Sequence, residues 1–109
     1  MIPLCKQYFV YILRCQNGSL YTGYTTDLAS RYAAHLAGKC KYTRSFKPVE
    51  IASSWIIHGD KADAMRVERY IKSLPRWEKD RLLSSPGLLS NQFQTQALSI
   101  LYCAPMSFR

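Results

Sequence analysis

Short apolar runs separated by polar breaks dominate the first quarter of the chain. Tyr8–Arg14 is rich in aromatic and β-branched residues, and Leu20–Tyr24 has the same character after a break at Asn17 and Gly18. An Asn-Gly pair between two such runs is typical of a tight turn that requires positive φ. The pattern therefore predicts a β-hairpin, each arm of which carries a tyrosine at mid-strand.

Helical periodicity follows the hairpin. Thr26 or Asp27 is suited to cap a helix over Leu28–Ala37, and Gly38 ends it. The apolar stripe of this helix consists of Leu28, Tyr32 and Leu36. A third strand is predicted over Ile51–Ile57, which is again rich in β-branched and aromatic residues.

Two further helices are predicted after the third strand. Asp60 caps the first of them, and Asp63 three residues later makes a partial capping box. This helix extends to Leu74, where a proline ends it. The same proline suits the first turn of the next helix, Pro75–Leu83, and we expect Trp77 to anchor that helix to the core.

A change of composition marks the end of this pattern. The 109 residues suffice for one domain with a modest core. No charged residue occurs from Gly87 to Phe108, although the preceding segment is strongly charged. We therefore predict one domain over residues 1–86 and an apolar tail over residues 87–109. Gln92–Leu101 in this tail is either a helix packed on the core or a surface for self-association, so the expected state is a monomer or a weak homodimer.

Positive charge is concentrated between Ala29 and Val49 and again between Arg66 and Arg81. The net charge is +8, and the residues from Ala29 to Val49 include five basic side chains and no acidic one. Lys39–Pro48 within this segment is predicted to be a basic loop. Because phosphate contacts release counterions, such a surface favours nucleic acid as the partner, and the alternative is a solvated surface with a basic bias. The residues expected to contact nucleic acid are Lys39, Lys41, Arg44, Lys47, Arg66 and Lys72.

The cysteines and the N-terminal residues bear on the expected cellular location. Cys5, Cys15, Cys40 and Cys103 form no C-x-x-C pair, so neither a zinc site nor a disulfide framework is expected. We expect Cys15 and Cys103 to be buried and Cys40 to lie in the basic loop. Met1–Gln7 is too short for a signal peptide, and no apolar run approaches the ~20 residues of a membrane helix. A cytoplasmic protein without a membrane partner is therefore expected.

One carboxylate interrupts the apolar face of the second predicted helix. Glu68 shares its stripe with Ala64, Ile71 and Leu74. A carboxylate that faces a core is costly unless it is paired or binds a cation. Two interpretations remain open at this point, namely a buried ion pair with Arg31 and a metal ligand at the floor of a basic cleft. Mg²⁺ suits the second, since it keeps most of its waters and can take one protein carboxylate.

Four more side chains carry groups suited to phosphate chemistry. Tyr11 and Tyr21 stand on the two hairpin arms, and Arg31 and His35 lie one helical turn apart. An arginine can neutralise charge on a phosphate under attack, and a histidine can relay a proton or polarise a tyrosine. A phenol with a pKa near ~10 is a poor base unless a cation or an adjacent base assists it. The ordinary alternatives are packed aromatic rings, a solvated arginine and a structural histidine.

These residues, in this order, resemble the GIY-YIG nuclease superfamily and, within it, the small stand-alone bacterial UPF0213 group. The two tripeptides of the family match Val10–Ile12 and Tyr21–Gly23. Arg31 lies ten residues after the tyrosine of the second tripeptide, and His35 follows four residues later, as in the family motif.

The resemblance continues to about Ser84. Lys41–Arg44 and Pro48 match the basic loop of the UPF0213 group, and Ala64–Lys72 matches the helix that carries the family's metal-binding glutamate. The resemblance implies a small α/β fold of the α+β kind, with a three-stranded antiparallel sheet flanked by helices.

The resemblance also implies an activity. A Mg²⁺- or Mn²⁺-dependent endonuclease would cleave DNA, with RNA as the alternative polymer, by one-metal hydrolysis. Glu68 would bind the metal, and Tyr11 or Tyr21 would help deprotonate the attacking water. Arg31 would steady the charge of the pentacovalent phosphorus, and His35 would support the tyrosine or the phosphate.

Two departures from the family keep a second function open. Tyr24 stands where some relatives carry a lysine. The resemblance to stand-alone members also implies that no DNA-recognition domain is appended. The alternative is therefore a non-catalytic protein that keeps the fold and binds nucleic acid without strict sequence preference.

Overall fold

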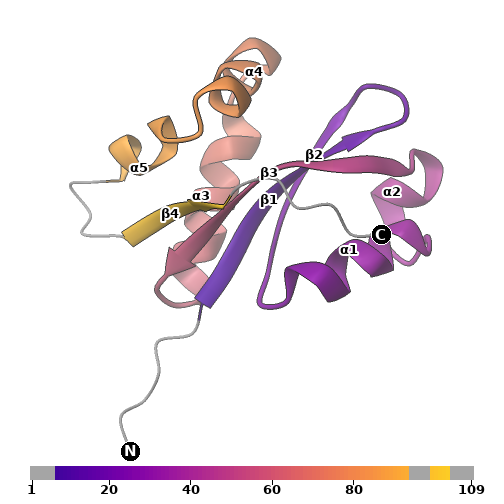
Figure 1. The fold of residues 1–109 in the computed structure, drawn as a ribbon, viewed down its shortest axis with the longest axis horizontal. Coiled ribbons are helices and arrows are strands. Elements are labelled where there is room, and N and C mark those ends of the chain that lie inside the picture. The colour runs from indigo at the N-terminus through magenta and orange to yellow at the C-terminus, as the bar shows by residue number, and fades with distance from the viewer. Residues whose placement is uncertain (1–6, 94–98, 104–109) are drawn as a thin grey trace, which may run out of the picture.

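The computed structural model describes residues 7–93 and 99–103, and for 99–103 it describes the backbone alone. In chain order the elements are β1 (Gln7–Cys15), β2 (Leu20–Thr25), α1 (Leu28–Leu36), α2 (Lys41–Ser45), β3 (Pro48–His58), α3 (Lys61–Ser73), α4 (Arg76–Ser84), α5 (Leu88–Gln92) and β4 (Ser99–Cys103) (Figure 1).

The strands form one antiparallel sheet in the order β2-β1-β3-β4. The predicted α+β fold, with three antiparallel strands flanked by helices, is confirmed by β2, β1 and β3. The tail adds β4 to the outer side of β3 as a fourth strand, which the sequence pattern did not predict. Within the sheet Tyr11 lies opposite Gly23 of β2 and Ser54 of β3.

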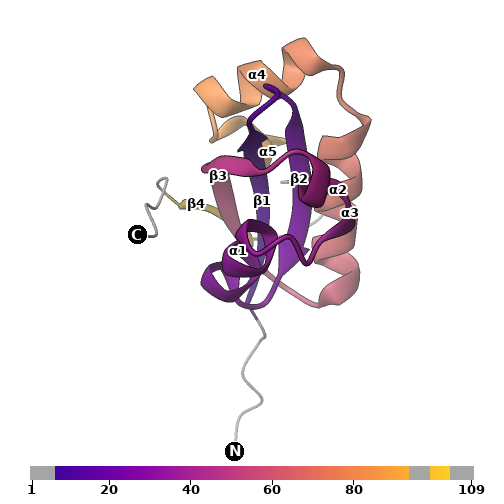
Figure 2. The same cartoon turned by 90° about the vertical axis from the view of Figure 1, so that its right-hand side faces the viewer.

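Successive side chains of β1 face opposite sides of the sheet, because side chains alternate along a strand. Val10 and Ile12 pack beneath α3 together with Trp55 of β3, whereas Tyr11 and Leu13 pack beneath α1. Helices α3 and α1 therefore cover opposite faces (Figure 2).

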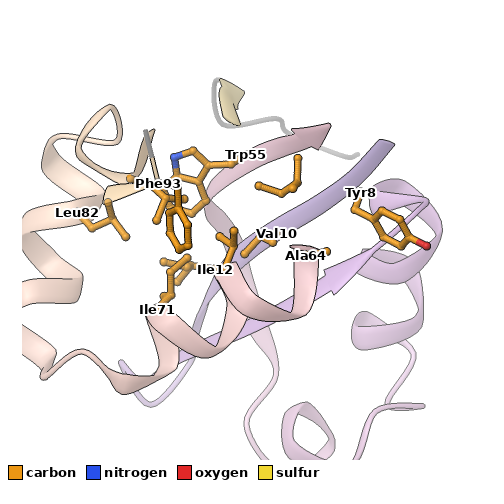
Figure 3. Close-up of a cluster of buried hydrophobic side chains, with 11 residues drawn as sticks. Tyr8, Val10, Ile12, Trp55, Ala64, Ile71, Leu82 and Phe93 are labelled. Atoms are coloured by element: carbon orange, nitrogen blue, oxygen red, sulfur yellow. The ribbon is translucent and has the colours of Figure 1, made fainter. Parts of the chain in front are cut away.

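The larger core lies between the sheet and α3. Figure 3 shows Val10 and Ile12 beside α3, with Leu82 and Phe93 near one end of the cluster and Tyr8 at the other. Leu82 comes from α4, and Phe93 follows α5 directly, so both C-terminal helices are attached to this core.

The local signals for turns and caps are confirmed. Gly18 adopts a φ of 83° in the hairpin turn, which glycine accepts without a Cβ clash. Asp27 is the N-cap of α1 and accepts a hydrogen bond from the Ser30 amide. At α3 the Asp60 carboxylate accepts from the Asp63 amide, and the Asp63 carboxylate accepts from the Asp60 amide, which completes the capping box.

Three local predictions were wrong. The stretch Lys39–Pro48 is not a continuous loop, because it contains α2 and its final proline begins β3. Trp77 is not an anchor, since it is 64% exposed while Leu82 is the buried residue of α4. Five residues separate the two, which places them roughly 140° apart around the helix.

The proposed helix over Gln92–Leu101 is also not observed. Helix α5 ends at Gln92, and the last three residues of that range belong to β4; residues 94–98 lie outside the described part. Cys15 is buried, Cys40 is partly exposed, and the other two cysteines fall outside the side chains described. None of the described helices is long and apolar enough to cross a membrane.

Candidate active site

A polar cleft of about 400 Å³ opens at the β2 edge of the sheet. Its lining comes from both faces, because β2 is the edge strand and the side chains of α1 and α3 meet around it. The lining residues are Tyr8, Tyr11, Tyr21, Gly23, Tyr24, Thr25, Thr26, Arg31, Lys61 and Glu68. Four of the five predicted catalytic residues thus line the cleft, and the fifth, His35, contacts one of them from behind.

The Tyr11 ring reaches the cleft by crossing the backbone of its neighbouring strand. A Cβ placed on Gly23 would lie 2.5 Å from the Tyr11 hydroxyl oxygen and 2.7 Å from the ring carbon that bears it. A side chain at this position would force the Tyr11 ring to move, so glycine is needed there to keep the ring in place. The glycine of the second tripeptide therefore has a local physical reason, which is to let the tyrosine of the first one pass.

A buried hydrogen-bonded chain supports the Tyr11 hydroxyl. The Tyr11 oxygen lies 2.9 Å from Nε2 of His35, and Nδ1 of the same ring lies 2.7 Å from Oγ1 of Thr43. Tyr11, His35 and Thr43 are at most 2% exposed. A histidine with a partner on each ring nitrogen is held in one orientation, which is the arrangement expected of a positioned base.

Burial determines the protonation states of this chain. Burial, with Arg31 as a second cause, lowers the pKa of His35, so the imidazole is neutral at pH 7. Burial also raises the pKa of Tyr11 well above its ordinary value, with Tyr21 adding to the rise and Arg31 opposing it. The Tyr11 phenol is therefore protonated and can donate a hydrogen bond to Nε2 of His35. The His35 tautomer that matches this carries its proton on Nδ1 and donates it to Oγ1 of Thr43.

Tyr21 forms the second aromatic wall. Its ring centroid lies 5.0 Å from that of His35 and 6.4 Å from that of Tyr11. Burial is the main cause of a raised pKa at Tyr21. The charges of Cys40 and Glu68 raise that pKa further, and Arg31 lowers it. Neither phenol is ionised at neutral pH in this environment, and only Tyr11 has a neighbouring base at hydrogen-bonding distance.

Glu68 presents its carboxylate to the cleft from α3. Its side chain is 18% exposed, and Oε1 lies 3.6 Å from Nζ of Lys72, one turn along the helix. The ion pair considered with Arg31 is not present; the partner is this solvent-exposed lysine instead. Such a pair at a helix surface is weak, so it leaves the carboxylate able to take another cation.

A single-carboxylate metal site fits this geometry. Among the described residues there is no group of three or more His, Cys, Asp or Glu side chains that could enclose an ion. Mg²⁺ and Mn²⁺ accept such a site, since water and substrate phosphate supply the remaining oxygen ligands. Zinc and other ions that need several protein ligands do not fit it.

The predicted nucleic-acid contacts fall into two groups. Lys39, Lys41, Arg44 and Lys47 are exposed on and around α2, where no acidic partner is found among the described residues. Arg66 and Lys72 lie on α3 and pair with Asp63 and Glu68. The group around α2 is therefore the stronger candidate for phosphate contact.

Two cleft features were missed by the sequence interpretation. Lys61, the first residue of α3, lines the cleft with Arg31 and supplies a second cation near Tyr24. Its position two helical turns before Glu68 could have revealed it. Thr43 was treated as part of a loop, and its bond to His35 has no signal in the sequence.

Comparison with known proteins identifies the family of the domain that holds this cleft. The model of the GIY-YIG catalytic domain matches residues 7–79. The UPF0213 protein BH0048 of Halalkalibacterium halodurans is 44% identical over 81 residues, which cover 73% of this chain and 85% of the relative. The UPF0213 protein OB0043 of Oceanobacillus iheyensis is 47% identical over 81 residues, covering 72% and 91% respectively.

A solved structure is also similar. The solution NMR structure of UPF0213 protein BH0048 from Bacillus halodurans has 44% sequence identity and a TM-score of 0.44, with 72% of this chain and 83% of that one covered. From the family model and the identities, the chain belongs to the GIY-YIG catalytic domain family, a family of nucleases.

Proposed function

We propose that this protein is a metal-dependent endonuclease that hydrolyses phosphodiester bonds in DNA, with RNA as the alternative polymer. The supporting observation is the cleft itself, in which Tyr11, Arg31 and Glu68 from three different elements converge on one polar hollow. A core packing role does not require these three groups to meet at an open edge.

Tyr11 is the better supported of the two tyrosines as the group that assists the attacking water. In the proposed step a water proton passes to the Tyr11 oxygen while the Tyr11 proton passes to Nε2 of His35. Because both transfers occur together, the raised pKa of the phenol does not require a free phenolate. The hydroxide then attacks phosphorus as the bond from phosphorus to the 3′ oxygen breaks. The leaving 3′ oxygen takes up a proton from solvent, and the proton on His35 is released to solvent afterwards.

Positive groups on two sides of the cleft would stabilise the negative charge of the phosphate. Arg31 on α1 is exposed and free of acidic partners among the described residues, so it can donate to phosphate oxygens. Glu68 would hold Mg²⁺ or Mn²⁺, which when bound stabilises negative charge on the phosphate and on the leaving oxygen. Lys61 adds a cation further along α3, suited to the phosphate of a neighbouring nucleotide.

The test is cleavage of plasmid and labelled oligonucleotides by purified protein with Mg²⁺ or Mn²⁺. Glu68→Gln and Glu68→Ala should abolish product formation while binding of the same DNA is retained. Glu78→Gln is the matched control, because Glu78 lies on α4 away from the cleft. Cleavage that persists in a clean Glu68→Ala preparation would refute the assignment.

The non-catalytic alternative has a separate signature. A binding protein would retain nucleic acid in a salt-sensitive manner and yield no product with any divalent metal. Charge removal around α2 weakens binding under both hypotheses, so only the metal and Glu68 experiments separate them.

A further inference from the structure

A row of three aromatic rings leads out of the cleft along α2. The Tyr21 ring is stacked on Tyr42, with centroids 5.6 Å apart and planes at 29°, and Tyr42 contacts Phe46 at 6.1 Å. Tyr42 and Phe46 are 43% and 41% exposed. Single exposed aromatic residues are common, but two neighbouring ones that continue a row from the partly buried Tyr21 require an explanation.

The row is held in place by its neighbours. The Tyr42 hydroxyl donates to Oγ of Ser19 at 3.0 Å, which fixes the ring from the hairpin turn. Thr43, the next residue, is fully buried and bonded to His35. The five-residue helix α2 is therefore tied to the centre of the site while its aromatic side chains face outward.

An open hollow lies along this row. Its volume is about 470 Å³, and its walls include Lys41, Tyr42 and Phe46. Tyr21 lines both this hollow and the cleft, so the two adjoin at this one side chain. A polymer whose phosphate occupies the cleft therefore has its next nucleotide at the hollow.

We infer that Tyr42 and Phe46 form a stacking subsite for one unpaired nucleobase, adjacent to the phosphate that is cleaved. Every base has a π face, so aromatic rings bordered by a lysine, here Lys41, bind nucleotides without reading their sequence. Bases inside a duplex cannot reach the rings, and the subsite therefore requires a single-stranded, bulged or flipped nucleotide. This inference rests on the proposed function for the position of the phosphate.

The experiment measures binding separately from cleavage. In a Glu68→Gln background, fluorescence anisotropy gives the affinity for a single-stranded oligonucleotide of about 12 nucleotides and for a hairpin duplex. The variants are Tyr42→Leu and Phe46→Leu, with Tyr42→Phe as the conservative change. Trp77→Leu is the matched control, since Trp77 is an exposed aromatic residue on α4 away from both hollows.

Each leucine variant should weaken single-strand binding about 5- to 100-fold, with duplex binding changed less than about twofold. Trp77→Leu should bind like the parent. Tyr42→Phe keeps the ring but loses the bond to Ser19, so it should weaken binding less than Tyr42→Leu does. A series of oligonucleotides with one abasic position should identify a base whose removal weakens the parent as much as Tyr42→Leu does. Removing the same base should not weaken binding further in Tyr42→Leu, because the contact between that base and the Tyr42 ring is already absent in this variant.

Several results would overturn the subsite. Equal losses on single strands and duplexes would mean that α2 contributes only charge or stability. Unchanged binding in both leucine variants, with melting temperatures equal to that of the parent, would place the base elsewhere. If the rings instead bind an apolar surface of another protein, abasic oligonucleotides should bind as tightly as intact ones.

The outcomes also separate this inference from the proposed function. If protein with Glu68 intact cuts DNA but the leucine variants bind and cut normally, the subsite fails and the nuclease assignment stands. If no metal supports cleavage but the leucine variants lose single-strand binding selectively, the subsite stands and the nuclease assignment fails. Absence of nucleic-acid binding by the parent protein would contradict both.

Discussion

The hydroxyl of Tyr11 occupies the space that a side chain on Gly23 would need, in a pair of residues that lie directly opposite each other in the β1–β2 ladder. The two family tripeptides are thus one structural unit. The first supplies the phenol, and the second supplies the gap through which it reaches the cleft.

Gly23→Ala should therefore impair activity more than stability. The new Cβ would lie 2.5 Å from the Tyr11 oxygen, so the phenol must move and its bond to His35 must lengthen or break. We expect a loss of about 1–3 kcal/mol in the free energy of unfolding and at least tenfold in kcat. Gly87→Ala is the control, because no atom lies within 4 Å of a Cβ added there. Normal kcat in a folded Gly23→Ala variant would show that the position of Tyr11 is unimportant.

Stability should fall with acid in a way that depends on His35. Its pKa is below the ordinary value of 6.5, chiefly through burial. As the pH drops below 6.5, the unfolded chain takes up a proton that the folded protein binds less readily, so the free energy of unfolding decreases. Above 6.5 this contribution is fully present.

Urea unfolding at a series of pH values between about 7 and about 5 tests this linkage. The dependence of the free energy of unfolding on pH should be weaker in His35→Gln than in the parent. Identical slopes in the parent and in His35→Gln would mean that His35 titrates normally in the folded state.

Thr43 should matter through its hydroxyl. Thr43→Val keeps the shape but leaves Nδ1 of the buried His35 without its partner, at a cost of about 1–3 kcal/mol. Thr43→Ser restores an oxygen and should recover most of the melting temperature and of kcat. A valine variant as active and stable as the serine one would contradict a role for this bond.

Lys72 should compete weakly with the proposed metal at Glu68. An exposed pair of this kind is worth about 0.3–0.5 kcal/mol, so Lys72→Gln should lower the Mn²⁺ concentration for half-maximal cleavage by about twofold. Lys79→Gln on α4 is the control. A higher Mn²⁺ requirement in Lys72→Gln would indicate instead that Lys72 contacts the substrate phosphate.

The start of the tail should be part of the cooperative fold. Leu89 of α5 is fully buried in the core beneath the sheet, so Leu89→Ala should cost about 2–5 kcal/mol. Trp77→Ala removes a larger but mainly exposed side chain and should cost about 0.5 kcal/mol or less. Chemical denaturation of both variants makes the comparison, and a neutral Leu89→Ala would mean that the domain ends before α5.

The parts of the fold that could be predicted from sequence are those with local causes. The turn at Gly18 and the caps at Asp27 and Asp60 depend on residues within three or four positions. Glu68 was found because a carboxylate on an apolar helical stripe is unusual. Helix α2 is only five residues long and has a single buried residue, so it carries no hydrophobic period to detect.

The remaining parts depend on contacts between distant segments. The pairing of β4 with β3 joins residues more than 40 positions apart, and its apolar sequence is equally compatible with a packed helix. Lys61 joins the cleft only because α3 crosses the sheet next to β2. The sequence could nominate the reactive side chains, but the bond that selects Tyr11 over Tyr21 required the packing of α1 against β1.

The strand order has a consequence for assembly. Among the described strands, β1 and β3 have neighbours on both sides, so the edges that can pair further are β2, beside the cleft, and β4, at the far boundary. Two copies joined through β4 about a twofold axis would form one continuous sheet with a cleft at each extremity. Self-association by this route would leave both clefts open, and a dimer could hold two nucleic-acid strands at once.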